Sequence, residues 1–504
     1  MFRPSLQEFE RLAVDAGLVP IYREIIADLD TPLTIFAKVA GGESHAFLFE
    51  SLEGGEKWGR YSFIGFDPIV SFASRGTRIT ITREGKEEAQ DGDPLAALQN
   101  LLKSFNACNA EMACDPELLP RFFGGAVGFL GYDMVRFMER LPESNSPLDE
   151  FPESAFMVPR TVLIYDNLRQ LLTVVNLVQT SGAGTQTRDI PALYAKAQAE
   201  IEKVIARLQA PMPTEYLGGS ARQSVAPHSF TANMTEAAFE KMVEAAKEYI
   251  QAGDIIQVVL SQRFHTKTAL EPFKLYRALR HINPSPYLFY LKLGDLVQIG
   301  SSPEILVRLE QEDIELRPIA GTRKRGRNQE EDAALEQELL ADPKERAEHL
   351  MLVDLGRNDV GRVASYGSVE VRDLLVVERY SHVMHLVSGV HGTLAPGKDQ
   401  FDVLRACFPA GTVSGAPKIR AMEIIEELEP ERRGPYAGSV GYFGFSGNMD
   451  FCITIRTFVM QGDDLWVQAG AGIVADSVPA LEYQETINKS MGLRRAVELA
   501  EKEF

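Results

Sequence analysis

The chain has 504 residues, of which 45% are hydrophobic, and its formal net charge is -19. This length predicts two domains or one unusually large one. Because nucleic acids and anionic membranes attract positively charged surfaces, the acidic balance excludes broad binding to either. The sequence contains no stretch that approaches the roughly 18 apolar residues of a membrane-spanning helix.

The cysteines and the first residues indicate the cellular compartment in which the protein is expected. Cys108, Cys114, Cys407 and Cys452 form neither a CxxC pair nor a metal-ligand spacing, which is typical of buried thiols in a reducing environment. The first residues, MFRPSLQEFERLA, contain early acidic residues and no apolar signal-peptide core. Together these features predict a cytoplasmic protein.

A segment rich in Pro, Gly and Ser, residues 209–229, divides the chain into an N-terminal region, 1–208, and a C-terminal region, 230–504. In the N-terminal region, alternation of apolar and polar residues predicts a strand at 78–85 and a hairpin within 160–178. The chain is therefore expected to begin with sheet structure and to continue, beyond the linker, into a second region.

Helix signals dominate the start of the C-terminal region. Thr235 can cap a helix whose apolar residues recur every three or four positions, and Gly253 can end it. Asp342 and Pro343 predict the N-cap and first residue of another helix, which runs to about Leu355. Further elements are expected as a strand at 255–264, a hairpin formed by 436–445 and 450–460, and a final long helix opened by Ser477 and Pro479.

Two segments resemble each other, GAVGFLGY at 125–132 and GSVGYFGF at 438–445. The similarity is explained either by chance and common strand chemistry, or by two related strands in two stacked sheets. The sequence shows no repeat of fixed period, which excludes solenoids and propellers.

Two glutamate pairs, Glu345 with Glu348 and Glu482 with Glu485, are spaced three residues apart on predicted helices. This spacing puts both carboxylates of a pair on one helix face. Such hard oxygen ligands suit Mg²⁺, which takes one or two protein carboxylates together with water and substrate oxygens. The alternative is a solvated helix face on which Lys489 pairs with Glu485.

Arg456 lies in the apolar segment FCITIRTFV, which predicts a strand with Arg456, Thr454 and Cys452 on one face. If both faces are covered, the guanidinium requires an anionic partner, and arginine is suited to bind a carboxylate through two hydrogen bonds. The alternative is an arginine on the solvent side of a strand.

Two other segments offer polar groups. Residues 408–425, FPAGTVSGAPKIRAMEII, place a glycine-rich loop with Lys418 before a helix, where free N–H groups can cradle an anion. The spacing and Pro417 exclude a P-loop. His385, in the run SHVMHLVSG with His382, is either a structural histidine or an acid–base group. The sequence lacks the HExxH and GxSxG signatures of zinc proteases and α/β-hydrolases.

Taken together, these segments resemble the chorismate-utilising enzymes along nearly the whole chain. The segments that carry the resemblance are FESLEGGEKWGRYSFIG (49–65), NPSPYLFY (283–290), GSSPE (300–304), RPIAGTRKRG (317–326), ERAEHLMLVDLGRND (345–359), SHVMHLVSG (381–389), FPAGTVSGAPKIRAMEII (408–425), PYAGSVGY (435–442), ITIRT (453–457), QAGAGIVADS (468–477) and EYQET (482–486). The resemblance implies an α/β fold of the α+β type, a sandwich of large, mainly antiparallel sheets with helices on the outer faces.

The resemblance also implies roles for individual residues. Glu348 and Glu485 would hold Mg²⁺ against the ring carboxylate of chorismate, with Glu345 and Glu482 nearby, and the metal would ease loss of the ring hydroxyl as a Lewis acid. The implied catalytic residues are His385, Glu304 and Thr412, with Glu304 as the acid for the departing hydroxyl and His385 as the acid–base group near the pyruvate elimination. The implied substrate-binding residues are Gly321, Thr322, Tyr436, Arg456, Gly470, Ala471 and Gly472.

Residues 317–327, RPIAGTRKRGR, contain five basic residues and no acidic one. Gly321 and Thr322 are expected to face the substrate, while the flanking cations raise the local potential for a dianion. Relatives that make aminodeoxychorismate resemble PIKGT, in which the lysine attacks the ring. Because Ala320 stands at that place here, the resemblance implies direct attack of ammonia on C2. Pyruvate loss would then give anthranilate, the first step of tryptophan biosynthesis.

The resemblance implies two further partners. The chain lacks the G-x-C-x-G motif of a glutamine amidotransferase, so the use of glutamine requires a separate glutaminase subunit and predicts a hetero-oligomer. Feedback inhibition by tryptophan is also implied. The residues implied to bind it are Glu50, Ser51, Pro286, Tyr287 and Leu288, although FES stands here where many relatives have LES.

Three alternatives stay open from the sequence. Within the family they are an aminodeoxychorismate synthase and an isochorismate or salicylate synthase, which uses water and a basic lysine. The third alternative is not an enzyme but a non-catalytic sensor that keeps only tryptophan binding. Glu348, Glu485, His385 and Arg456 argue against a sensor, because tryptophan binding does not need all four.

Overall fold

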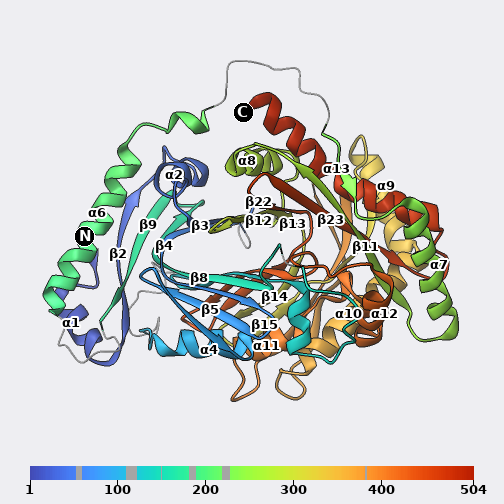
Figure 1. Cartoon of the computed structure of the whole chain (residues 1–504), viewed down its shortest axis with the longest axis horizontal. Coiled ribbons are helices and arrows are strands. Elements are labelled where there is room, and N and C mark those ends of the chain that lie inside the picture. The colour runs from blue at the N-terminus through green and yellow to red at the C-terminus, as the bar shows by residue number, and fades with distance from the viewer. Residues whose placement is uncertain (53–58, 109–121, 149, 181–188, 218–227, 381–382) are drawn as a thin grey trace.

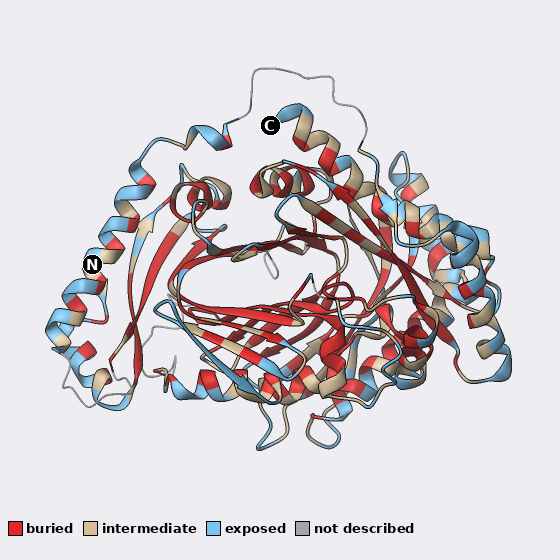
Figure 2. Ribbon diagram, in the orientation of Figure 1, coloured by how far each residue is buried: buried red, intermediate tan, exposed pale blue. Residues whose placement is uncertain are grey.

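The computed structural model describes residues 1–52, 59–108, 122–148, 150–180, 189–217, 228–380 and 383–504. Two large sheets face one another, and helices cover their outer surfaces (Figure 1). Buried residues concentrate on the strands, while exposed residues lie mainly on the outer sides of the helices (Figure 2). This architecture confirms the predicted sandwich of mainly antiparallel sheets.

The first sheet contains strands from both sequence regions. Its strands are β4 (Tyr61–Arg75), β5 (Arg78–Arg83), β6 (Lys86–Asp91), β7 (Gly125–Leu130), β8 (Ser154–Asp166), β14 (Ile305–Glu310), β15 (Asp313–Leu316), β16 (Ile319–Lys324), β17 (Glu370–Arg379), β18 (Val383–Thr393), β20 (Ser439–Gly444) and β21 (Met449–Ile453). Their order is β6-β5-β4-β8-β7-β20-β21-β14-β15-β18-β17, and β16 follows β15 along the same side of β18.

The second sheet includes the other strands and also contains parts of β4 and β8. Its own strands are β1 (Phe2–Arg3), β2 (Leu18–Ile26), β3 (His45–Glu50), β9 (Leu171–Gln179), β10 (Thr231–Ala232), β11 (Gln257–Lys267), β12 (Tyr287–Leu293), β13 (Leu296–Ser302), β19 (Gly415–Ala416), β22 (Thr457–Gln461) and β23 (Asp464–Ile473). The order is β1-β2-β9-β8-β4-β3-β12-β13-β22-β23-β11, with the short β10 and β19 beyond β11.

The long strands β4 and β8 run through both sheets. Residues 63–66 of β4 pair with β3 in the second sheet, whereas residues 70–75 pair with β5 in the first. The change occurs at a register shift between Pro68 and Val70, just after Asp67, which has φ 56°. Because a β-bulge bends its strand, this position turns the chain from one sheet into the other. The two sheets therefore meet at a shared corner.

The helices close the outer faces. They are α1 (Leu6–Asp15), α2 (Pro32–Val39), α4 (Pro94–Ser104), α6 (Ile190–Gln209), α7 (Glu236–Ala252), α8 (Pro272–Ile282), α9 (Gln329–Ala341), α10 (Pro343–Gly361), α11 (Gln400–Cys407), α12 (Lys418–Leu428) and α13 (Pro479–Glu503), with the 3-10 turns η1 (Tyr132–Phe137), η2 (Thr214–Tyr216) and η3 (Gly411–Val413). Helix α6 packs on β9, α8 and α13 pack on the second sheet, and α10 packs on β16 and β18 (Figure 1).

The predicted starts of α7 and α10 and the predicted end of α7 are confirmed. The Thr235 hydroxyl accepts a hydrogen bond from the third residue of α7, and Gly253 ends that helix in the left-handed conformation with φ 85°. Asp342 caps α10 through the N–H groups of Lys344 and Glu345. Helix α10 continues beyond the expected end to Gly361, because its buried face packs against β16 and β18.

The two sequence regions share sheets and a core. Strand β3 pairs with β12, and β7 pairs with β20. One cluster of buried side chains contains Phe47 and Phe129 together with Phe289 and Phe443. The division predicted at 209–229 stays a prediction, and residues 218–227 of it lie outside the described ranges.

The two similar segments form neighbouring strands of one sheet, so the alternative explanation that placed them in two stacked sheets is wrong. In the β7–β20 pair, Gly128 lies opposite Gly441. A Cβ atom built on Gly128 would lie 2.0 Å from the backbone oxygen of Ala155, and one on Gly441 would lie 2.0 Å from that of Asp450. The shared glycine pattern therefore follows from close backbone packing.

Cys108, Cys407 and Cys452 are buried, and Cys114 lies outside the described residues. Across the described ranges, every helix is too short or too polar to cross a membrane.

Gly128→Ala is expected to lower the free energy of unfolding by about 3 kcal/mol, because the added methyl group forces the neighbouring strand to move. Urea unfolding of the purified chain measures this loss. Gly492→Ala is the control, because Gly492 lies within α13 with no atom near its Cβ position. Alanine there should stabilise by about 1 kcal/mol. Equal stability of Gly128→Ala and wild type would contradict the packing argument.

Candidate active site

A cavity of about 480 Å³ lies between the two sheets in the C-terminal region. Its walls come from β11 and β23 of the second sheet, β16 and β18 of the first, and helices α10 and α13. The predicted residues that line it are Glu304, Gly321, Thr322, Glu345, Glu348, His385, Thr412, Tyr436, Arg456, Gly470, Gly472, Glu482 and Glu485. Ala471 is the exception, because its side chain packs in the core beside Ile473.

His385 is oriented by a bulge in β16. The register of β16 shifts between Ala320 and Thr322, and Gly321 there has φ 72°. His385 Nδ1 lies 3.1 Å from the Gly321 carbonyl oxygen and 3.0 Å from the Thr322 hydroxyl. A carbonyl only accepts, so Nδ1 carries the proton and the neutral ring has its free electron pair on Nε2. Burial lowers the pKa of His385, which favours this neutral form.

Glu304 follows β13 and is 7% exposed. Burial raises the pKa of its carboxyl to about 8, although the Ile319 N–H and the nearby Thr412 hydroxyl favour the anion. The buried Thr412 hydroxyl makes no well-formed hydrogen bond to any described group. At neutral pH Glu304 is therefore a protonated acid at the cavity wall.

Tyr436 lies directly against β23. A Cβ atom on Gly470 would lie 2.7 Å from the Tyr436 hydroxyl oxygen, so only glycine permits this approach. Burial raises the pKa of Tyr436 to about 12, partly offset by Arg433. Its hydroxyl therefore keeps its proton and can donate a hydrogen bond into the cavity.

Arg456 does not continue a strand, so the predicted uninterrupted strand across 450–460 is wrong. Strand β21 ends at Ile453, β22 begins at Thr457, and Arg456 lies between them with φ 51°. One of its Nη atoms donates to the Lys489 carbonyl at 2.9 Å. Among the described residues, no ion pair joins Arg456 to a carboxylate. Burial lowers its pKa, yet a guanidinium stays charged in proteins, so Arg456 offers donors for an anion in the cavity.

The four glutamates approach the cavity from α10 and α13. Glu348 accepts a hydrogen bond of 3.1 Å from Gln257, and Glu485 pairs with Lys489 at 2.6 Å, as the alternative interpretation expected. Burial raises the pKa of Glu348, and the neighbouring charges of Glu345 and Glu485 raise it further. Burial also raises the pKa of Glu482.

These carboxylates fit a hard divalent cation. Their mutual repulsion is what such a cation would relieve, and their oxygens are the donors that Mg²⁺ prefers. In the described part of the chain, no group of three His, Cys, Asp or Glu forms a complete metal site.

The basic segment 317–327 does not supply the expected positive potential. Arg323 pairs with Glu338, Asp342 and Glu345 at 2.8–2.9 Å. The other arginine pairs are Arg317 with Glu378, Arg325 with Asp332, and Arg327 with Glu331. The expectation was wrong because the segment folds against acidic residues of α9, α10 and β17. The cationic groups that line the cavity are Lys344, Arg456 and Lys489.

Lys418 also differs from its predicted role. Its Nζ atom donates to Asp359 at 2.6 Å, and both side chains are buried. Lys418 is therefore not available to bind an anion with the glycine-rich loop. It ties the start of α12 to α10, and thereby holds the loop that carries Thr412.

Sequence reasoning missed Gln257, Lys344 and Gln468 as cavity residues. Gln257 and Gln468 lie on β11 and β23, where strand alternation gives no sign of which face borders a cavity. Lys344 directly precedes Glu345 in the first turn of α10. Its place beside a predicted site residue was the signal that it too could reach the cavity.

A smaller cavity, of about 60 Å³, contains all five residues predicted to bind tryptophan, namely Glu50, Ser51, Pro286, Tyr287 and Leu288. Its wall includes aromatic residues. The Glu50 carboxylate already accepts hydrogen bonds from Arg280, at 3.1 and 3.2 Å, and from Tyr276. Tyr287 donates to Asp450 at 2.9 Å, and Arg308 pairs with the same carboxylate at 2.7 Å.

The chain is similar to known proteins along nearly its whole length. Residues 45–495 match the chorismate binding enzyme family. The chain is 47% identical to anthranilate synthase component 1 of Acetivibrio thermocellus over 99% of both chains. It is 48% identical to the protein of that name from Aquifex aeolicus, over 99% of this chain and 98% of the other. The crystal structure of anthranilate synthase component I from Streptococcus pneumoniae TIGR4 superposes with a TM-score of 0.76 and 36% identity, covering 93% of this chain and 99% of that one.

The environment of Glu304 predicts a pH-dependent stability difference. In the folded chain Glu304 holds its proton up to about pH 8, while in the unfolded chain it ionises near its ordinary value of 4.5. Wild type should therefore lose stability from this group as the pH rises between these values. The glutamine of Glu304→Gln cannot ionise, so this loss is absent from the variant. The free energy of unfolding of the variant minus that of wild type should therefore rise by a few kcal/mol as the pH increases across that range.

Urea unfolding of both proteins at several pH values from about 5 to about 8.5 measures this difference. A difference that stays constant with pH would show that Glu304 is not held in its neutral form.

Proposed function

The chain belongs to the family of chorismate binding enzymes, and we propose that within it the chain is the synthase subunit of an anthranilate synthase. Such an enzyme aminates chorismate and eliminates pyruvate to give anthranilate. The observation that carries the proposal is one cavity lined by a buried acid, a neutral histidine, a guanidinium that pairs with no described carboxylate, and four glutamates.

Chorismate carries two carboxylates, and the cavity offers distinct partners for them. Arg456 and the Tyr436 hydroxyl bind one carboxylate, since both present donors beside the open backbone of Gly470. Glu348 and Glu485, with Glu345 and Glu482 nearby, would hold Mg²⁺, which when bound neutralises the ring carboxylate as a Lewis acid.

The proton transfers use the two groups whose protonation the fold sets. Ammonia attacks C2 of the ring, and Glu304 gives its proton to the departing hydroxyl, which leaves as water. The Thr412 hydroxyl lies close enough to the Glu304 carboxyl to favour its anion, and it would stabilise the carboxylate that remains once the proton has left. His385 then takes the C2 proton on Nε2 while the ring C3–O bond breaks, and the ring becomes aromatic. The departing enolpyruvate gains a proton at its methylene carbon and becomes pyruvate, which balances the proton taken from C2.

Ala320 favours ammonia as the nucleophile. It lies in β16 directly before Gly321, and its methyl group cannot attack the ring as a lysine could. The proposal includes a separate glutaminase subunit that supplies ammonia, and a cytoplasmic location in which the buried thiols stay reduced.

The direct test is anthranilate fluorescence with the purified chain, chorismate, Mg²⁺ and an ammonium salt. Anthranilate is expected with ammonium, and not with glutamine alone. A metal chelator should abolish the signal, and added Mg²⁺ should restore it. Consumption of chorismate without anthranilate would reject the proposed product, and product analysis would then identify aminodeoxychorismate or isochorismate. No consumption would favour a sensor.

We further propose that the smaller cavity binds tryptophan and inhibits the enzyme. Its aromatic wall suits an indole, and its volume of about 60 Å³ means that bound tryptophan must push wall residues apart. Glu50 helps by anchoring β3 to α8 rather than by offering a free carboxylate.

Ser51→Phe should therefore weaken tryptophan inhibition by about tenfold or more, because its ring enters the cavity, and leave the uninhibited rate within about twofold. The inhibition constant and the uninhibited rate are measured in the same fluorescence assay. Loss of both inhibition and activity would assign Ser51 a structural role instead. Unchanged inhibition would remove this cavity from regulation.

A further inference from the structure

Arg433 lies behind the wall of the large cavity and is 1% exposed. It donates to the Val413 carbonyl at 2.7 Å and to the Val259 carbonyl at 2.6 Å. Two further hydrogen bonds, at 2.9 and 2.6 Å, join it to the Glu429 carboxylate. The guanidinium is planar with donors in fixed directions, so these bonds set the relative positions of the groups that accept them.

Both carbonyls that Arg433 contacts belong to residues of the cavity wall. Val259 and Val413 line the cavity, and Val413 follows Thr412 in η3. The guanidinium also lies 5.7 Å from the ring centroid of Tyr436, within the range of a cation–π contact. Three segments far apart in sequence therefore meet on one side chain.

Glu429 extends the arrangement to a fourth segment. Its carboxylate accepts hydrogen bonds from the backbone N–H of Ser261 at 2.8 Å and from the Ser261 hydroxyl at 2.9 Å. Gln468, which lines the cavity from β23, donates to the same hydroxyl at 2.9 Å. The Glu429–Arg433 pair is thus continuous with both strands of the second sheet at the cavity.

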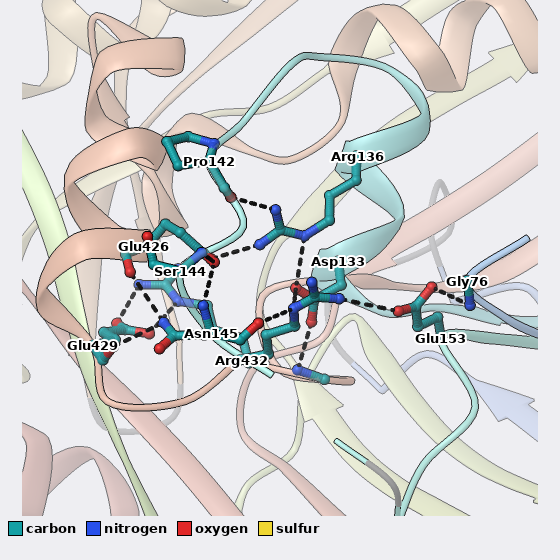
Figure 3. Close-up of polar contacts among 12 residues, drawn as sticks. Gly76, Asp133, Arg136, Pro142, Ser144, Asn145, Glu153, Glu426, Glu429 and Arg432 are labelled. Atoms are coloured by element: carbon teal, nitrogen blue, oxygen red, sulfur yellow. Dashed lines mark hydrogen bonds and ion pairs between the residues drawn. The ribbon is translucent and has the colours of Figure 1, made fainter. Parts of the chain in front are cut away.

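Polar residues of the N-terminal region form hydrogen bonds with the segment that carries this pair (Figure 3). Asn145 donates to the Glu429 carbonyl at 2.9 Å, and Arg432 donates back to the Asn145 carbonyl at 3.0 Å. On the other side of Arg433, the Gly434 N–H donates to Asp133 at 3.2 Å. The backbone on both sides of Arg433 is therefore fixed by residues from the other sequence region.

A buried ion pair is weak support for stability alone, because desolvation can cancel the attraction between its charges. Arg433 also contacts two carbonyls and one aromatic ring of the cavity wall, so its contacts bear on the shape of the cavity as well as on stability. We propose that Arg433, held by Glu429, is a positioning residue that fixes Val259, the Thr412–Val413 turn and Tyr436 relative to one another for binding chorismate. This proposal rests on the proposed function.

The test compares Arg433→Lys with Arg136→Lys in the ammonium-dependent assay. Lysine keeps the charge but cannot make the same four bonds. We expect the KM for chorismate to rise about tenfold or more in Arg433→Lys, with the KM for ammonium within about twofold of wild type. A general loss of folded protein would lower kcat and leave both KM values unchanged.

Arg136 is the matched control. It pairs with Glu426 at 2.6 Å in the same network, its side chain is 13% exposed, and it is not a residue of the cavity wall. Arg136→Lys should lower the melting temperature by a similar amount while both KM values stay within about twofold of wild type. Equal KM values for chorismate in the two variants would overturn the proposal.

Ser261→Ala provides a second variant if Arg433→Lys does not fold. It removes only the hydroxyl that joins Glu429 to Gln468, and should raise the KM for chorismate about threefold. An unchanged KM in a folded Ser261→Ala, with Arg433→Lys unfolded, would also overturn the positioning role. A wild-type chain that forms no anthranilate would instead reject the proposed function.

Discussion

The continuity of β4 and β8 through both sheets is the constraint on which the rest of the structure depends. Each strand pairs with one sheet along its first half and with the other along its second half. The bulge at Pro68 makes this possible, because it turns β4 without ending its hydrogen-bonded pairing. Two sheets joined at a corner must diverge away from it. The divergence leaves room in the C-terminal region, and the large cavity lies there.

Few positively charged side chains line that cavity. The chain is acidic overall, and most of its arginines near the cavity are neutralised by neighbouring carboxylates, as Arg323 is by Glu338, Asp342 and Glu345. The cavity therefore presents a few defined groups rather than a broad positive field. Burial keeps Glu304 protonated and His385 neutral, so the acid and the base are in the forms that the proposed chemistry requires.

Close packing decides which residues can form the wall. Glycine at 470 lets the Tyr436 hydroxyl lie against β23, and glycine at 472 does the same for the Gln257 amide. The same demand explains the glycines that β7 and β20 share. The N-terminal region also contacts the backbone behind the cavity, through Asn145 and Asp133. It therefore helps to position a site whose lining residues all come from the C-terminal region.

The sequence by itself determined the local elements and the membership of the site. Thr235, Gly253 and Asp342 mark helix ends because capping is a local interaction, and the motif segments identified nearly all the residues that line the cavity. It could not determine that Arg456 lies between two strands, that Ala471 faces the core, or that the basic segment is neutralised. Those outcomes depend on partners distant in sequence, such as Lys489 for Arg456 and Glu378 for Arg317. Only the tertiary structure decided them, because burial and charge pairing are set by what packs around a side chain rather than by its neighbours along the chain.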